Sequence, residues 1–371
     1  LLAAMGLSLL LAGWGVLDRL YPAASEASVR ISPADPLPSP FYGSNTVGQT
    51  AVDALATVVD PPRNLVTPFV EMFAVEAPPG AFWHAVFSAL WVAVVWGIIG
   101  GAIARIAVVE LATGERVGFL SALRFAVRKG APLIGAPLTP MLGVAFFTAW
   151  CALMGVFYRI PSSAVHSVLG VFAFLPLLAG LVMAIILLGL AAGWPLMHAT
   201  VAAESEDTFD ALSRSYAYVY QRPGHYLAYA ALAWVLGAIG LLVVSLFARA
   251  TVKLALWGLS FGAPDDLLLS LFQPAMATDQ PLPVVIHSQW IGFVSLLAYG
   301  WVYSYFWTAS TVIYLLLRHD VDGTDWNDIV QSEPETPTAS PQSPPNAEPA
   351  TTQPLANLPD QPAGDSVNQQ S

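Results

Sequence analysis

The histidines are the side chains in this chain best suited to metal, haem or proton chemistry. Paired inside a helical bundle, they could serve as axial haem ligands or as a proton relay. Each one, however, lies at or near the end of an apolar run, where we expect it at the membrane interface and not facing another histidine. We therefore predict no metal, no haem and no other cofactor. The six residues are His84, His166, His198, His225, His287 and His319.

Three acidic residues follow His198 closely, and together they form the nearest approach to a metal-binding cluster. They are Glu204, Glu206 and Asp207. Acidic side chains are also favoured at the N-terminus of a helix, where they interact with the helix dipole. Because a helix is predicted to begin at Thr208, we interpret these residues as part of its start and assign no metal site.

The segment Asp320-Val321-Asp322-Gly323 has two aspartates before a glycine, as a calcium-binding loop does. If Gly323 took the sixth position of such a loop, Arg318 and Ile329 would take the first and twelfth, which require carboxylates. The match therefore fails. The single cysteine, Cys151, excludes an intramolecular disulfide and argues against a cysteine-based zinc site. No catalytic residues are assigned, and the chain is predicted not to be an enzyme.

The composition indicates a protein of the lipid bilayer. Hydrophobic residues make up 56% of the 371 residues and charged residues only 11%, against roughly a quarter charged in soluble domains. The net charge of -11 is located mainly in the C-terminal tail, because nine acidic residues follow Arg318, the last basic residue. An acidic tail argues against nucleic acid as a partner.

The predicted fold is all-α: a polytopic membrane helical bundle of about six spans with two interfacial amphipathic connector helices. A spanning helix needs about 20 apolar residues. The first run could instead be a cleaved signal peptide, since Pro22-Ala23-Ala24 follows it. Residues 18–80 are predicted to form an external loop region, with possible helices at 50–59 and 64–73, and residues 319–371 an acidic disordered tail. The predicted spans are 1–17, 81–104, 140–158, 164–196, 226–247 and 284–317.

Prolines within the fourth run predict a local break. Pro176 and Pro195 lie inside or at the end of residues 164–196. Because proline lacks the backbone N–H that a helix interior needs, we expect a kink or an early stop there.

The two connector helices are predicted at residues 115–129 and 208–222, within the membrane bundle of residues 81–318. In the second, apolar side chains recur at helical spacing, which is typical of a helix lying in the membrane interface. Its apolar stripe is expected to face the membrane or the bundle, and Arg214 to meet water or lipid headgroups. The residues assigned to this interfacial helix are Phe209, Leu212, Arg214, Tyr216, Val219, Tyr220 and Arg222.

Two pairs of glycines have the GxxxG spacing that lets helices approach closely. The pairs are Gly97 with Gly101 and Gly189 with Gly193. In a protein with six spans we expect each pair to pack against another span of the same chain, and dimerisation is the alternative.

Orientation follows from the basic residues. Eight lysines and arginines fall on the side of the connectors and six on the other, or three once the long loop of residues 18–80 is set aside. Because short cytoplasmic loops are enriched in lysine and arginine, we place both connectors and the C-terminal tail in the cytoplasm. The predicted location is a bacterial inner membrane.

A shift of 89 residues superimposes parts of the two halves. Glu115 then aligns with Glu204, and Ala122-Leu123 with Ala211-Leu212. Each half would consist of a span, a surface helix and a second span. A duplicated unit in one orientation is one interpretation of this pattern, and chance similarity between apolar segments is the other.

The run of Glu204, Ala211-Leu212, Arg214-Ser215 and Arg222-Pro223-Gly224 resembles uncharacterised bacterial multi-pass inner-membrane proteins. More loosely, it is similar to the helical membrane domain attached to some glycerophosphodiester phosphodiesterases. The resemblance covers roughly residues 80–250 and implies architecture only, because nothing in the chain resembles the soluble phosphodiesterase domain.

Together these observations predict a non-enzymatic accessory or scaffold component of the membrane. A permease or channel for an uncharged or lipid-like substrate is the alternative, since no charged residue is predicted at the middle of a span. The expected partners are the lipid bilayer and other membrane proteins.

Overall fold

The computed structural model describes residues 1–25, 47–73, 78, 80–264 and 282–328. Within this part every element is a helix and no strand occurs. The tail from residue 329 onward, and the proline-rich stretch 26–46 of the predicted external loop, lie outside the described residues. The prediction of disorder in the tail therefore stays a prediction.

Five helices of the described part are long and apolar enough to cross a membrane, as expected of a membrane-embedded protein. The sixth predicted span lies within α13 (Leu282–Asp322), which is helical and does not belong to these five. The prediction of an all-helical membrane protein is thus confirmed, whereas six spans stay a prediction. The five helices are α1 (Leu2–Leu20), α5 (Ala81–Thr113), α7 (Gly130–Phe157), α9 (Phe174–Glu204) and α11 (Pro223–Leu259).

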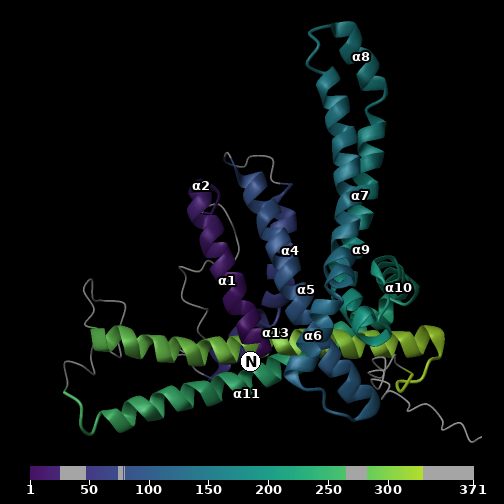
Figure 1. The fold of residues 1–371 in the computed structure, drawn as a ribbon. Coiled ribbons are helices and arrows are strands. Elements are labelled where there is room, and N and C mark those ends of the chain that lie inside the picture. Colours follow the sequence, from purple (N-terminus) through teal and green to yellow (C-terminus); the bar gives the residue numbers. More distant parts are fainter. Residues whose placement is uncertain (26–46, 74–77, 79, 265–281, 329–371) are drawn as a thin grey trace, which may run out of the picture. The chain divides into compact units, whose positions relative to one another are not determined.

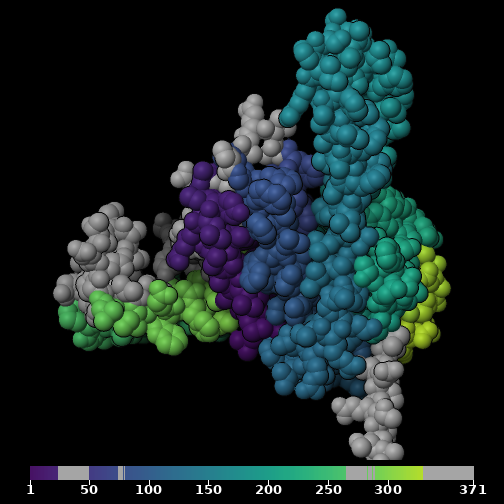
Figure 2. All heavy atoms as spheres, turned by 45° about the horizontal axis from the view of Figure 1, so that its top comes forward, coloured from purple at the N-terminus to yellow at the C-terminus, as the bar shows by residue number. Residues whose placement is uncertain are grey.

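Helices α7 and α9 pair along their length, and the short helix α8 (Ser163–Val171) lies at their turn (Figure 1). The helix is interrupted by a turn at residues 172–173, between α8 and α9, so the predicted run 164–196 forms two helices. Pro176 falls in the first turn of α9, where proline costs no hydrogen bond, and α9 continues through Pro195. The outer half of the hairpin stands clear of the other described helices (Figure 2). It exposes many apolar side chains, which suits contact with lipid.

Part of the predicted external loop packs into the protein core. Helices α3 (Val47–Thr57) and α4 (Asp60–Glu71) follow the short helix α2 (Pro22–Ser25), and α4 packs against α5. Leu65 and Phe69 of α4 are buried, so this helix belongs to the protein core and not to an external loop. The burial is possible because the polar residues of α4 find partners on α13.

Those partners are two tyrosines one turn apart. Tyr299 donates a hydrogen bond of 2.6 Å to Asp60, and Asn64 donates one of 2.8 Å to the hydroxyl of Tyr303. The ring of Tyr303 stacks on Trp96 of α5 with a centroid separation of 4.7 Å. Buried polar groups are tolerated when they are hydrogen-bonded, so α4 is held between α5 and α13.

The two connectors have the same local design. Helix α5 ends at Gly114 and α9 at Ser205, each in the left-handed conformation that commonly terminates helices. The chain then turns back, and α6 (Phe119–Arg128) packs on α5 while α10 (Thr208–Gln221) packs on α9. The bounds of both connector helices lie within four residues of the predicted ones.

Candidate functional site

A buried carboxylate organises the end of α9. The side chain of Glu204 is 7% exposed and receives donors from two other helices. The hydroxyl of Tyr314 donates to Oε1 at 2.7 Å, and Nε of Arg318 lies 3.0 Å from the same oxygen. Arg214 of α10 pairs with Oε2. We call these four residues, with Glu206, the Glu204 network.

Glu206 extends this network toward the surface. Nη2 of Arg214 lies 2.8 Å from Oε1 of Glu206, so one guanidinium bridges two carboxylates. Burial alone would lower the pKa of Arg214, but Glu204 and Glu206 outweigh it and raise that pKa. The side chain of Arg214 is 42% exposed and so still meets water, but its pairing with two carboxylates was not part of the prediction.

The start of α10 explains why Arg214 can reach Glu204. Asp207 is the N-cap residue, and its carboxylate accepts from the backbone N–H groups of Phe209, at 2.9 Å, and Asp210, at 3.0 Å. Such caps stabilise a helix by about 1 kcal/mol. Asp207 therefore starts a helix, as predicted, whereas Glu204 and Glu206 bind Arg214 across the turn.

The end of α13 is bound to the same region. The hydroxyl of Tyr229 donates to Asp320 at 2.8 Å, and that of Tyr218 donates to Asp322. Burial, followed by the carboxylate of Asp322, raises the pKa of Tyr218. Arg318 also donates to the backbone carbonyl of Asp328 at 2.8 Å. Residues 319–328, which were predicted to begin the disordered tail, are thus part of the folded body.

Two cations cap the last carbonyls of α9. Arg105 donates to the carbonyl of Ala202 at 2.6 Å, and Lys129 donates to that of Ser205 at 2.7 Å. Cations are favoured there because the C-terminus of a helix carries a partial negative charge. Arg105 is 4% exposed, so its side chain is buried and does not extend to the surface.

The predicted stripe of α10 only partly matches its buried face. The helix buries Ala211, Ser215, Tyr218 and Val219, whereas Leu212 and Tyr216 are half-buried. The exposed members of the predicted set are Phe209, Tyr220 and Arg222. The buried face differs from the sequence stripe because α10 packs on α9 through a face that includes the small residues Ala211 and Ser215.

The glycine pairs lie at close contacts within the chain. Gly97 and Gly101 of α5 face Ile134 and Leu133 of α7. Gly189 and Gly193 of α9 instead face Tyr216 of the connector α10. A Cβ at Gly189 would lie 2.1 Å from Cε1 of Tyr216, so no larger residue fits.

Two histidines that were predicted to be interfacial are buried. His84 is 2% exposed, and its Nε2 lies 3.1 Å from the Asp18 carboxylate. His198 is 1% exposed and packs on the ring of Trp307 with a centroid separation of 4.6 Å. No group of three metal-binding side chains occurs among residues that the structure describes.

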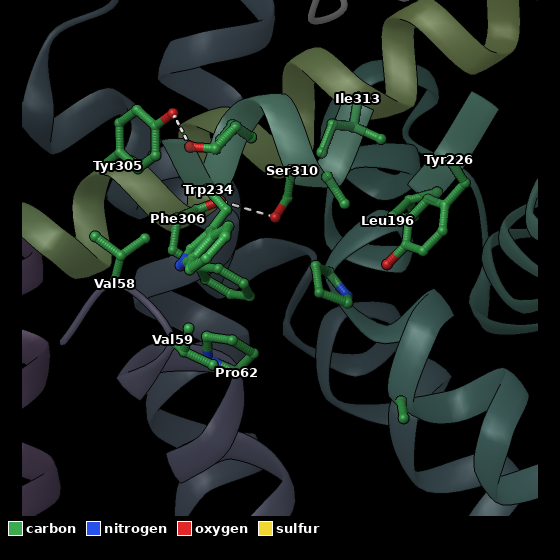
Figure 3. A pocket seen from close by; sticks show the side chains of 15 residues that line it. Val58, Val59, Pro62, Leu196, Tyr226, Trp234, Tyr305, Phe306, Ser310 and Ile313 are labelled. Atoms are coloured by element: carbon green, nitrogen blue, oxygen red, sulfur yellow. Dashed lines mark hydrogen bonds between the residues drawn. The ribbon is translucent and has the colours of Figure 1, made fainter. Parts of the chain in front are cut away.

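An apolar pocket of about 260 Å³ lies between α9, α11, α13 and the α3–α4 turn (Figure 3). Its polar groups are already paired within the protein. The hydroxyl of Tyr305 donates to Ala233 at 2.7 Å, Ser310 to Phe306 at 2.7 Å, and Tyr226 to Ala192 at 3.0 Å. The lining includes Val58, Pro62, Leu196, Trp234, Phe306 and Ile313.

Neither the pocket nor the Glu204 network was predicted. Each site joins segments that are distant in sequence, as Glu204 and Tyr314 are, 110 positions apart. Apolar pocket residues are also indistinguishable in sequence from span residues. One available indication was the helical spacing of Tyr314 and Arg318, which lie four residues apart.

No known protein family matches the chain, and neither a curated protein nor a solved structure shows significant similarity to it.

Proposed function

We propose that the protein is a non-enzymatic membrane component that binds an uncharged, lipid-like molecule in the apolar pocket. The pairing of the pocket's polar groups supports this proposal. The hydroxyls of Tyr226, Tyr305 and Ser310 already donate to backbone carbonyls. A ligand in the pocket would therefore contact mainly apolar side chains. Such a surface favours hydrocarbon and penalises a charged group that would lose its hydration.

A photoreactive long-chain alcohol, which is uncharged, tests this proposal. Ala230 and Ala309 both line the pocket, and phenylalanine at either position would fill it. Wild-type protein should be labelled on peptides that contain Trp234 or Phe306, and Ala230→Phe or Ala309→Phe should reduce that labelling several-fold. Ala231→Phe is the matched control, because Ala231 is an exposed neighbour outside the lining.

The comparison is informative only for folded variants, so each must keep the wild-type thermal unfolding and elution profile. Equal labelling of all four proteins would contradict the proposal. So would labelling spread evenly over the exposed faces of α7 and α9.

A scaffold role is the second candidate, and the Glu204 network favours it. Ion pairs and tyrosine hydrogen bonds fix α10 and the end of α13 to α9, giving this side of the protein a defined surface. Phe209 and Tyr220 remain 69% and 50% exposed on α10. A photo-crosslinker placed at Phe209 should capture a protein if this surface is a scaffold, and lipid alone if it is not.

A further inference from the structure

Helix α6 presents a surface unlike that of α10. Only two small residues, Ala122 and Ala126, are buried against the rest of the protein. Three apolar side chains remain exposed: Phe119 at 47%, Leu120 at 65% and Val127 at 60%. An exposed apolar set of this kind needs a partner.

The exposed face is divided lengthwise into two stripes. Arg124 and Arg128 lie four residues apart and are both exposed. Leu120, Leu123 and Val127, at spacing i, i+3 and i+7, form the adjacent apolar stripe. A helix lying in the plane of a membrane has this division, with apolar residues toward the acyl chains and basic residues at the headgroups.

The positive charge of α6 is not neutralised within the described structure. Neither Arg124 nor Arg128 forms an ion pair with the part of the chain that the structure describes. Arg116, just before α6, reaches Glu110 only at 4.0 Å, and both side chains are largely exposed. In α10, by contrast, Arg214 is held by two carboxylates.

We propose that α6 binds the anionic headgroups of phospholipids, with Arg124 and Arg128 on the phosphates and Leu120 and Val127 among the upper acyl chains. Guanidinium groups form paired hydrogen bonds with phosphate oxygens. The apolar stripe selects a lipid over free phosphate, which would leave Leu120 and Val127 in water. This site is separate from the pocket, so it does not depend on the proposed function.

Native mass spectrometry of the full chain in detergent tests this site. The protein is titrated with short-chain phosphatidylglycerol or with short-chain phosphatidylcholine, and the bound lipids are counted. Wild type should bind phosphatidylglycerol more tightly. Each arginine should contribute about fivefold, so that Arg124→Gln with Arg128→Gln lowers the affinity about 25-fold.

Three controls make the result specific. Arg124→Lys with Arg128→Lys should retain most of the preference, because it keeps the charge. Arg159→Gln removes an exposed arginine far from α6 and should change nothing. Inorganic phosphate at millimolar concentration should not displace the lipid. Since both arginines are exposed, the variants should unfold like wild type.

Several outcomes would overturn the proposal. They are equal binding of the two lipids, an equal loss with Arg159→Gln, and displacement by inorganic phosphate alone. The acidic tail is a rival occupant of the arginines. If wild type showed no preference for phosphatidylglycerol, and Glu333→Gln with Glu335→Gln and Glu348→Gln created one, the tail and not the membrane would be the partner of α6 in the wild-type protein.

Discussion

Replacing Glu204 with glutamine tests whether the Glu204 network holds the end of α9 to α10 and α13. The side chains of Glu204 and Arg318 are 7% and 10% exposed. Removing one partner of a buried ion pair costs about 3–5 kcal/mol, because the other charge stays buried without compensation. Glutamine keeps the volume and still accepts from Tyr314, so the expected loss is near the lower limit, about 3 kcal/mol.

The neighbouring pair provides an internal comparison. Arg214 is 42% exposed, so water and salt screen its interaction with Glu206. Exposed pairs contribute about 0.2–1 kcal/mol, and Glu206→Gln should therefore cost less than about 1 kcal/mol. Raising the salt concentration should weaken this second effect and leave the effect of Glu204→Gln nearly unchanged.

The measurement is reversible unfolding in mixed micelles of a mild detergent and dodecyl sulfate, followed by tryptophan fluorescence. A cycle of Glu204→Gln, Arg318→Met and the double variant isolates the pair, and a coupling energy of about 0.5–3 kcal/mol is expected. Glu110→Gln is the control, since that side chain is 54% exposed. The buried pair does not hold these helix ends together if Glu204→Gln costs no more than Glu110→Gln, or if the effects of Glu204→Gln and Arg318→Met simply add.

Three further predictions concern packing, pH and topology. Gly189→Ala should destabilise the protein by about 1–3 kcal/mol, because the added Cβ would displace the ring of Tyr216. Gly180→Ala, where an added Cβ has nothing within 4 Å, is the control and should not destabilise it. Equal effects of the two changes in thermal unfolding would contradict the close contact at Gly189. Burial, followed by the hydrogen bond with Asp210, raises the pKa of Glu206 above its ordinary 4.5. The folded state then binds this proton more tightly than the unfolded state, so stability should increase as the pH falls through the raised pKa toward 4.5. Glu206→Gln should lack that increase, and an unchanged pH profile would count against the assignment. For topology, with Cys151 replaced by alanine, an impermeant thiol reagent should label Ser163→Cys but not Ser213→Cys in intact cells; the reverse pattern would invert the predicted orientation.

The helices themselves were largely predictable, because long apolar runs and helix caps are local features of the sequence. Asp207, two positions before Phe209, indicated the start of α10, and its carboxylate caps that helix as expected. The placement of α4 was not predictable. Its apolar stripe suits a membrane surface as well as a protein core, and the choice depends on Tyr299 and Tyr303, which lie 239 residues away from their partners.

The Glu204 network escaped prediction for a similar reason. Each charge had an adequate local explanation: acidic residues before a helix, an arginine on its surface and an arginine at the end of α13. Only the three-dimensional structure shows that Glu204, Arg214 and Arg318 meet. Pairing between distant segments leaves no periodicity in a single sequence, whereas helix formation does.

The structure strengthens the interpretation of a duplicated unit. With the shift of 89 residues, Ala122 aligns with Ala211 and Ala126 with Ser215, and all four are fully buried. Ala122 and Ala126 are the buried residues of α6, which packs on α5. Ala211 and Ser215 are buried in the same way on α10, which packs on α9. Chance matches among apolar residues would not be expected to share both the helix face and the degree of burial.

The two connectors differ in their charges within this shared packing. The positions that correspond to Arg124 and Arg128 of α6 are Ser213 and Ala217 of α10, which carry no charge. Conversely, Arg214 corresponds to Phe125, over whose ring the guanidinium of Arg105 lies at 4.8 Å. Helix α6 therefore keeps its positive charge on the outer face, whereas α10 directs the charge of Arg214 inward to Glu204. This difference predicts separate roles for the two connectors. Helix α6 should attract anionic headgroups, and α10 should hold the ends of α9 and α13 in place.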